Sequence, residues 1–366
     1  MTYVLHDKKY HVVSAFDPQT GAYVRSGILK DGKDTGKDPF MASFPHLIDV
    51  GVMGHCLHGK TGLCVKAGIG CYQSGLTVEQ PNMSVEDFRW IARQCRHKVN
   101  QFALGGRGDP DQHEQFEELL QICRENDIVP NFTTSGYGMT QDLANICKQY
   151  CGAVAVSWYR SPYTLRAIEM LLKAGVKTNV HYVLGNNSID EALERLEKKT
   201  FPDGINAVVF LLHKPIGLGS RENVLSSEDP RVARFFRNLD RSNTPYKVGV
   251  DSCTVPGIIN YCSRVTQQSL DTCEGGRFSC YISADLMMMP CSFDQTGRFS
   301  VSLRNKSIRE VWTSDTFEAF RASLRNSCPH CSQRDTCMGG CPLIPEVVLC
   351  QKAEKQQYTR KKEPCV

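Results

Sequence analysis

The sequence lacks any long hydrophobic stretch. No run of about eighteen apolar residues occurs in its 366 residues, which excludes an α-helical membrane span. The first residues, MTYVLHDKKYHVV, contain no apolar core, so we expect no signal peptide and a cytoplasmic location. A large excess of one charge is also missing. The 43 basic and 39 acidic residues leave a net charge of +4, which does not favour nucleic acid as a partner.

Cysteine, in contrast, is abundant. Reduced thiols prevail in the cytosol, so 18 cysteines in such a protein indicate metal binding rather than disulfides. Some of them fall in helix or strand patterns and are interpreted as packing residues: Cys95, Cys123, Cys147 and Cys151. The others form two groups, one before residue 75 and one after Asp251.

The first group lies on one glycine-rich loop, GHCLHGKTGLCVKAGIGCYQSG, between Gly54 and Gly75. It contains Cys56, Cys64 and Cys71 and follows an apolar run that predicts a strand. Three thiolates on such a loop favour a metal site with one open position. A zinc ion would need a fourth ligand or water, whereas an iron–sulfur cluster with three cysteines leaves one iron free.

Strand-like and helix-like segments alternate from residue 45 to about 250, which predicts right-handed βαβ units and a parallel sheet. We expect an α/β fold, a partial (β/α)6 TIM-type barrel, followed by a small cysteine-rich domain with a β-hairpin and short helices. The expected divisions are a lead-in at 1–44 with a possible hairpin at Pro18–Gly21, the barrel at 45–250, and the cysteine-rich domain at 251–366.

The carboxyl ends of the expected strands are rich in glycine and polar residues, and ligands bind at this edge in such folds. Gly105 and Gly106 would allow close approach of the backbone to a ligand. Cys253 follows the seventh strand beside Asp251 and is a candidate catalytic hydrogen donor, a ligand, or a buried thiol. Lys214 could bind a carboxylate, but the simpler interpretation is a solvated surface lysine.

The order of strand, three-cysteine loop, helix and a strand ending in Gly105–Gly106 resembles the radical S-adenosylmethionine (SAM) superfamily. The resemblance implies that the three loop cysteines hold a [4Fe-4S] cluster whose fourth iron binds SAM, with the glycine pair at its methionine end. The spacing Cx7Cx6C is wider than the usual CxxxCxxC, and Arg107 stands where the family often has Glu.

The resemblance also implies contacts with the rest of SAM. Ser135, Ser157 and the pair Leu184 and Gly185 fall where the family contacts ribose and adenine. Gly70 occupies the position of an aromatic residue before the last cysteine, and Tyr72 is expected to replace it.

The C-terminal stretch CPHCSQRDTCMGGC resembles the SPASM domain, which carries two auxiliary [4Fe-4S] clusters in many radical SAM enzymes. This implies three clusters in all. The first auxiliary cluster would be held by Cys273, Cys280, Cys291 and Cys341. The second would be held by Cys328, Cys331, Cys337 and either Cys350, which we favour, or Cys365. A zinc knuckle is the alternative for these CxxC pairs.

A two-stranded hairpin is expected between Cys280 and Leu303, with its turn at Asp294–Gly297. Leu286 stands five residues before Cys291, where the family has glycine. The hairpin would offer an edge to which an extended peptide could add as a strand.

By this resemblance the chain would cleave SAM to a 5′-deoxyadenosyl radical and abstract a hydrogen from a peptide or protein. A maturase of a ribosomally made peptide is favoured, forming a crosslink or thioether, or catalysing an epimerisation or oxidation. Its electron donor would be a low-potential protein of the flavodoxin or ferredoxin type. The same chemistry on a small molecule, and a non-enzymatic zinc protein, are the alternatives.

Overall fold

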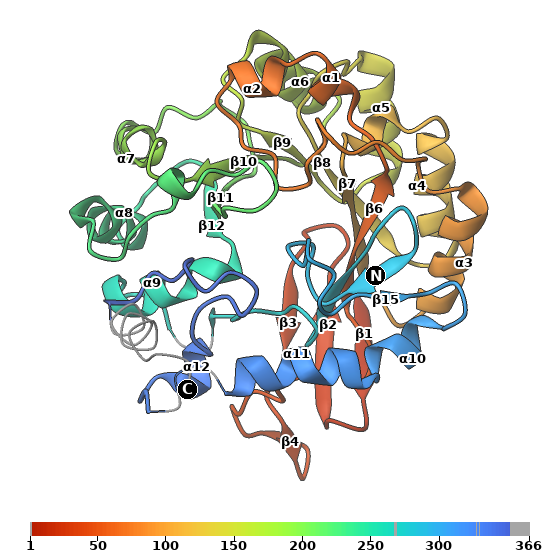
Figure 1. Cartoon of the computed structure of the whole chain (residues 1–366), viewed down its shortest axis with the longest axis vertical. Helices are drawn as coiled ribbons and strands as arrows, with labels where there is room; N and C mark the ends of the chain where they lie inside the picture. The colour runs from red at the N-terminus through yellow and green to blue at the C-terminus, as the bar shows by residue number, and fades with distance from the viewer. Residues whose placement is uncertain (1, 267–268, 327, 329, 352–366) are drawn as a thin grey trace, which may run out of the picture.

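The computed structural model describes residues 2–266, 269–326, 328 and 330–351 (Figure 1). Its centre is a curved parallel sheet with helices on the outer face, as expected for a partial barrel (Figure 1). The parallel strands are β6 (Leu47–Met53), β7 (Gln101–Gly106), β8 (Val129–Thr134), β9 (Val154–Ser157), β10 (Thr178–Leu184), β11 (Ala207–Leu212) and β12 (Lys247–Val250).

Six amphipathic helices connect these strands, each burying one apolar face against the sheet. Phe88 and Ile91 of the first helix, for example, are fully buried. Ser84 begins that helix by accepting a hydrogen bond from the backbone N–H of Asp87, as the sequence predicts. The helices are α3 (Val85–Cys95), α4 (Phe116–Glu125), α5 (Gln141–Tyr150), α6 (Pro162–Lys173), α7 (Ile189–Lys198) and α8 (Pro230–Asp240).

The N-terminal segment is more ordered than the sequence suggests. It forms an antiparallel sheet of β1 (Tyr3–Asp7), β2 (Val12–Phe16) and β3 (Tyr23–Arg25), followed by the small hairpin β4 (Leu29–Lys30) and β5 (Lys33–Asp34). The hairpin expected at Pro18–Gly21 is present as the β2–β3 turn. Strand β2 alternates in burial, with Val12, Ser14 and Phe16 buried, which explains why this short segment holds a fixed position.

The cysteine-rich segment continues the barrel sheet. Strand β13 (Ser279–Ile282) pairs in parallel with β6, and β14 (Met287–Met289) and β15 (Val301–Ser302) extend the sheet antiparallel. The expected turn at Asp294–Gly297 lies in the connection between β14 and β15, where the N–H of Gly297 donates to Asp294 O at 3.1 Å. A second turn, at 283–286, joins β13 to β14, and the N–H of Ser283 donates to Met287 O there at 2.9 Å. Leu286 has a φ of +67° in this turn, a conformation that glycine adopts more easily.

Four further helices belong to the C-terminal part and pack beside β1–β3 and the barrel opening (Figure 1). Arg277, buried, donates to both carboxylate oxygens of Asp38 at 2.8 and 2.9 Å, and the Trp312 indole donates to Ala42 O at 2.9 Å. These contacts fasten the C-terminal part to the lead-in. The helices are α9 (Val255–Tyr261), α10 (Ile308–Trp312), α11 (Asp315–Arg325) and α12 (Arg334–Cys337). Among the described residues no helix has the length and apolarity needed to cross a membrane.

Candidate functional site: cysteine groups around the barrel mouth

The three-cysteine loop leaves the carboxyl end of β6 and contains two short helices, α1 (Leu57–Lys60) and α2 (Leu63–Lys66). Cys56 begins α1, and its Sγ accepts a hydrogen bond from Gly59 N at 3.0 Å. Burial raises the pKa of the Cys56 thiol to about 11, and the charges of Cys71 and Cys64 also raise it. The charges of Cys64 and Cys71 therefore act on Cys56 despite the wide spacing of the three cysteines in the sequence. The raised pKa values of Cys56 and Cys64 keep these two thiols protonated unless a metal displaces the proton.

The predicted glycine pair lies beside this loop. Gly105 pairs with Gly51, Gly106 with Met53, and the register shifts between the two pairs. Gly106 has a φ of +116°, and a Cβ there would lie 2.5 Å from Met53 O, so a side chain is excluded. A Cβ on Gly105 would meet nothing within 4 Å, which leaves its backbone open to a ligand.

A cavity of about 260 Å³ lies at the carboxyl ends of β9–β11, against residues 67–70 of the cysteine loop. Ser157 lines it, as the sequence predicts, together with the following residues of the SWYRS segment. Glu191 is held at its edge by Arg160 Nε at 2.5 Å and Arg195 Nε at 2.7 Å. The other lining residues were not among the expected SAM contacts. They include Trp158, Tyr159, Arg160, His181, Asn187, Glu191, His213 and Asn223.

The other residues proposed for SAM contacts lie outside that lining. The Ser135 N–H and Oγ both donate to Asp109, at 2.8 and 2.5 Å, inside the protein. Leu184 is fully buried, and a Cβ on Gly185 would collide with the side chain of Asn223. Tyr72 packs against Phe293 with ring centroids 4.6 Å apart, because the chain after Cys71 turns toward β13–β15. The expectation that Tyr72 replaces the family's aromatic residue beside SAM stays a prediction.

A cluster of tyrosine side chains packs around His58 of the cysteine loop. His58 of α1 is stacked on Tyr159 at 5.4 Å and shares a 2.8 Å hydrogen bond with Tyr163 Oη. Tyr137 completes the cluster at 5.5 Å from His58. Burial lowers the pKa of His58, so the ring is neutral at pH 7. These residues come from separate elements, and no local pattern in the sequence could have grouped them.

The first C-terminal cysteine group differs from the expected one. Burial raises the pKa of Cys273 to about 11, with the charge of Cys341 next among the causes. Burial likewise raises the pKa values of Cys253 and Cys291, and Cys273 and Cys341 act on both thiols. Cys253, Cys273, Cys291 and Cys341 thus share one site.

Cys280, expected in that group, lies elsewhere. It is fully buried on β13 opposite Ile48 of β6, and its neighbouring thiol is Cys95 of α3. Because side chains alternate across a strand, Cys280 faces the helix layer rather than the barrel mouth. Cys280 thus lies apart from Cys273, Cys291 and Cys341 in this structure, and Cys253 lies beside them.

Lys214 adjoins the same group. Its side chain is 2% exposed, so the interpretation as a surface lysine is wrong. Its Nζ lies 2.8 Å from Asp251 Oδ2, 2.9 Å from Leu212 O and 4.5 Å from the ring centroid of Phe293. Burial opposes its charge, but Asp251 outweighs burial and raises the pKa of Lys214. A fixed cation therefore lies beside Cys253 and Cys291.

The second C-terminal group contains the cysteines expected from the sequence. Burial raises the pKa of Cys337 to about 11, and the charges of Cys350, Cys328 and Cys331 act on it. Cys365, the alternative to Cys350, lies outside the described residues. In the part of the chain that the structure describes, no three His, Cys, Asp or Glu side chains are arranged to hold a single metal ion.

Residues 273–337 match the family model of SPASM, an iron–sulfur cluster-binding domain. Among solved structures, SuiB of Streptococcus suis bound to its precursor peptide SuiA superposes with a TM-score of 0.66 at 13% identity, covering 93% of this chain and 94% of that one. SuiB bound to SAM gives 0.64 at 16% identity, with 85% and 78% covered. The protein anSMEcpe, with SAM and the Cp18Cys peptide, gives 0.58 at 16% identity, with 86% and 95% covered.

This is the fold of the radical SAM enzymes that carry a SPASM domain. The comparison with curated protein sequences gives no match. In this structure the three-cysteine loop follows β6 and the glycine pair ends β7, the neighbouring strand. The SPASM segment supplies the strands that extend the sheet past β6.

Proposed function

We propose that the protein is a radical SAM enzyme in which Cys56, Cys64 and Cys71 hold the SAM-binding [4Fe-4S] cluster. The observation that carries this is the convergence of three thiols beside the open backbone of Gly105 and the cavity at the strand ends. The two C-terminal cysteine groups would hold two auxiliary clusters. These are Cys253, Cys273, Cys291 and Cys341, and Cys328, Cys331, Cys337 and Cys350.

Cys56, Cys64 and Cys71 would hold the cluster to which SAM binds, and the two groups together would supply the radical chemistry that removes a hydrogen from the substrate. The chain contributes position and shielding. Residues 67–70, Ser157 and Trp158 enclose the cavity in which the nucleoside would lie, and the neutral His58 cluster keeps charge and water away from the loop. A low-potential protein of the flavodoxin or ferredoxin type would supply electrons.

A peptide or protein is the proposed substrate. SuiB has been solved with the precursor peptide SuiA and anSMEcpe with the Cp18Cys peptide, which supports this class. Strands β13 and β14 of the expected hairpin pair on both sides, and β15 (Val301–Ser302) ends the ten-stranded sheet. Strand β12 (Lys247–Val250) ends the sheet on the other side. We place the extended peptide along the hairpin edge at β15, with β12 as the alternative, through backbone hydrogen bonds.

The test is to incubate the reduced enzyme and SAM with the peptide encoded beside its gene. Mass spectrometry should show loss of two hydrogens for a crosslink or thioether, or deuterium uptake from solvent for an epimerisation. A Cys56→Ala enzyme is the control. If the peptide stays unchanged while small metabolites stimulate SAM cleavage, the small-molecule alternative replaces the peptide. Stoichiometric zinc without acid-labile sulfide would establish the non-enzymatic alternative.

A further inference from the structure

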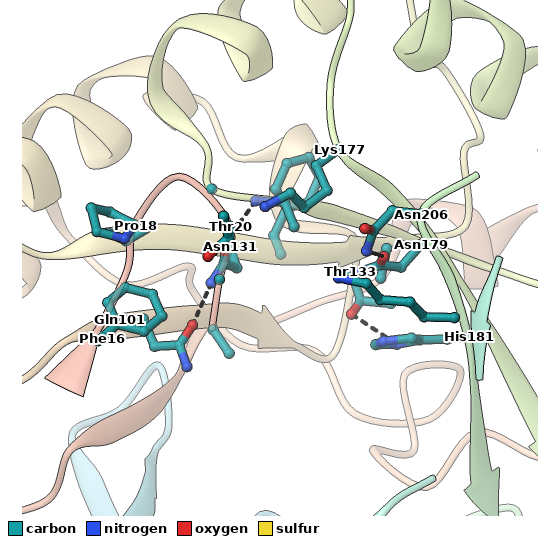
Figure 2. Close-up of a pocket in the computed structure, with 18 residues that line it drawn as sticks. Phe16, Pro18, Thr20, Gln101, Asn131, Thr133, Lys177, Asn179, His181 and Asn206 are labelled. Atoms are coloured by element: carbon teal, nitrogen blue, oxygen red, sulfur yellow. Dashed lines mark hydrogen bonds between the residues drawn. The ribbon is translucent and has the colours of Figure 1, made fainter. Parts of the chain in front are cut away.

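The end of the barrel opposite the cysteine loop contains a second cavity, of about 380 Å³ (Figure 2). It is formed where β7, β8, β10, β11 and β12 begin, and the β2–β3 turn covers it with Phe16, Pro18, Thr20 and Gly21. The interiors of such barrels are usually filled by branched apolar side chains. Here Ala103 and Ala155 are the small apolar residues of the lining, and six polar, half-buried side chains lie beside them: Gln101, Asn131, Thr133, Asn179, His181 and Asn206.

The amide groups leave N–H donors pointing into this cavity. Asn131 Oδ1 accepts from the backbone N–H of Ala153 at 2.8 Å, which fixes the orientation of its amide. Its Nδ2 must then donate to Gln101 Oε1, at 2.7 Å, and the NH2 group of Gln101 remains for another acceptor. Asn206 donates to Asn179 Oδ1 at 2.7 Å. The NH2 group of Asn179 therefore also remains for another acceptor.

Two lysines line the same cavity, and no carboxylate does. Lys177 donates to Gln19 O of the β2–β3 turn at 2.6 Å. Its pKa is lowered, first by burial and then by the charge of Lys247, while the charge of Asp17 in the β2–β3 turn acts in the opposite direction. Burial lowers the pKa of His181 to about 4, which keeps that ring neutral at pH 7.

We propose that this cavity binds a small organic oxyanion, a carboxylate or a phosphate. The NH2 groups of Gln101 and Asn179 donate hydrogen bonds to it, and Lys177 and Lys247 balance its charge. The volume falls at the small end of known ligand sites. The ligand would also join the N-terminal sheet to the barrel, because residues of both form the walls.

The site is distinct from the proposed reaction site, since it lies at the amino ends of the strands. His181 is a lining residue of both this cavity and the one beside the cysteine loop. The inference does not depend on the radical SAM activity. Its test measures binding alone.

The experiment is calorimetric titration of the anaerobic full-length protein with citrate and, separately, with tripolyphosphate. Lys247→Gln removes one cation. Asn179→Asp replaces a donor by a carboxylate of equal size. Each should weaken binding at least tenfold. Lys173→Gln, which makes the same charge change at an exposed position on α6, is the control and should bind like the wild type.

If citrate alone binds, the cavity is a carboxylate site. If tripolyphosphate alone binds, it is a phosphate site. If both bind, the cavity selects its ligand mainly by negative charge. Absence of binding in both titrations would overturn the proposal. So would equal affinity of the wild type, Lys247→Gln and Asn179→Asp. Circular dichroism and the iron content of each variant show whether it has kept its fold.

Discussion

Two residues show how far single positions can be understood from sequence. Cys253 and Cys280 are both cysteines of the C-terminal group, and spacing favoured Cys280. Side chains alternate between the two faces of a strand, and this alternation separates the two residues. Cys280 faces α3, whereas Cys253 follows β12 at the barrel mouth. Spacing in a sequence cannot say on which face a residue lies until the register of the strand is known.

The first prediction compares these two cysteines. Cys253→Ser should lower the iron and sulfide content by up to one cluster, or change the electron paramagnetic resonance signal of an auxiliary cluster. Cys280→Ser should leave both unchanged and only reduce stability, because it places a hydroxyl in an apolar core. Loss of a cluster from Cys280→Ser, with Cys253→Ser unaffected, would restore the spacing-based assignment.

The second prediction concerns Lys214. Replacing it by Met leaves the Asp251 carboxylate without its cation, and breaking a buried pair costs about 3–5 kcal/mol. Denaturant unfolding of Lys214→Met should therefore show a large loss of stability. The double variant Lys214→Met with Asp251→Asn should regain part of it, since no unpaired charge remains. Equal stability of the single variant and the wild type would show that the pair is solvated.

At the scale of elements, the sequence predicted the barrel better than its surroundings. The strands β6–β12 and the helices α3–α8 follow clear hydrophobic periods and cap signals, so their order could be predicted. The lead-in could not, because β1–β3 are short and gain their stability from packing on the barrel rather than from propensity. The pairing of β13 with β6 joins residues more than 200 positions apart, and no local signal encodes it.

The third prediction tests how the N-terminal sheet is held. His46 precedes β6, and its Nδ1 shares a 2.8 Å hydrogen bond with Tyr23 Oη of β3. Burial lowers the pKa of His46 from 6.5 to about 4. Between these values the unfolded chain binds a proton that the folded chain does not, so stability should fall as the pH drops from 6.5 to 4, by up to about 3 kcal/mol.

Thermal unfolding of His46→Asn should lack that part of the acid-induced loss. The Asn variant keeps a polar side chain but cannot take up the proton. His97→Asn, which makes the same exchange at an exposed position, is the matched control. An identical acid profile for His46→Asn and the wild type would show that His46 is not the group responsible.

At the scale of the whole molecule, three cysteine groups surround the mouth of one barrel. The cysteine loop follows β6 and contains α1 and α2, at the top of Figure 1. Along the chain, the C-terminal groups follow β12 and flank β13–β15. The composition predicted metal binding and the alternation predicted the barrel. The shared sheet, through which the C-terminal strands extend the barrel, required the structure.

The central claim is that Cys56, Cys64 and Cys71 hold the cluster that cleaves SAM. The most direct measurement is 5′-deoxyadenosine formation by the anaerobically reconstituted protein with dithionite and SAM, for the wild type and the variant with all three cysteines changed to alanine. We predict that the wild type forms 5′-deoxyadenosine, and that the variant forms none while keeping the iron of its C-terminal groups. No product from the cluster-loaded wild type, or continued formation by the variant, would contradict the account.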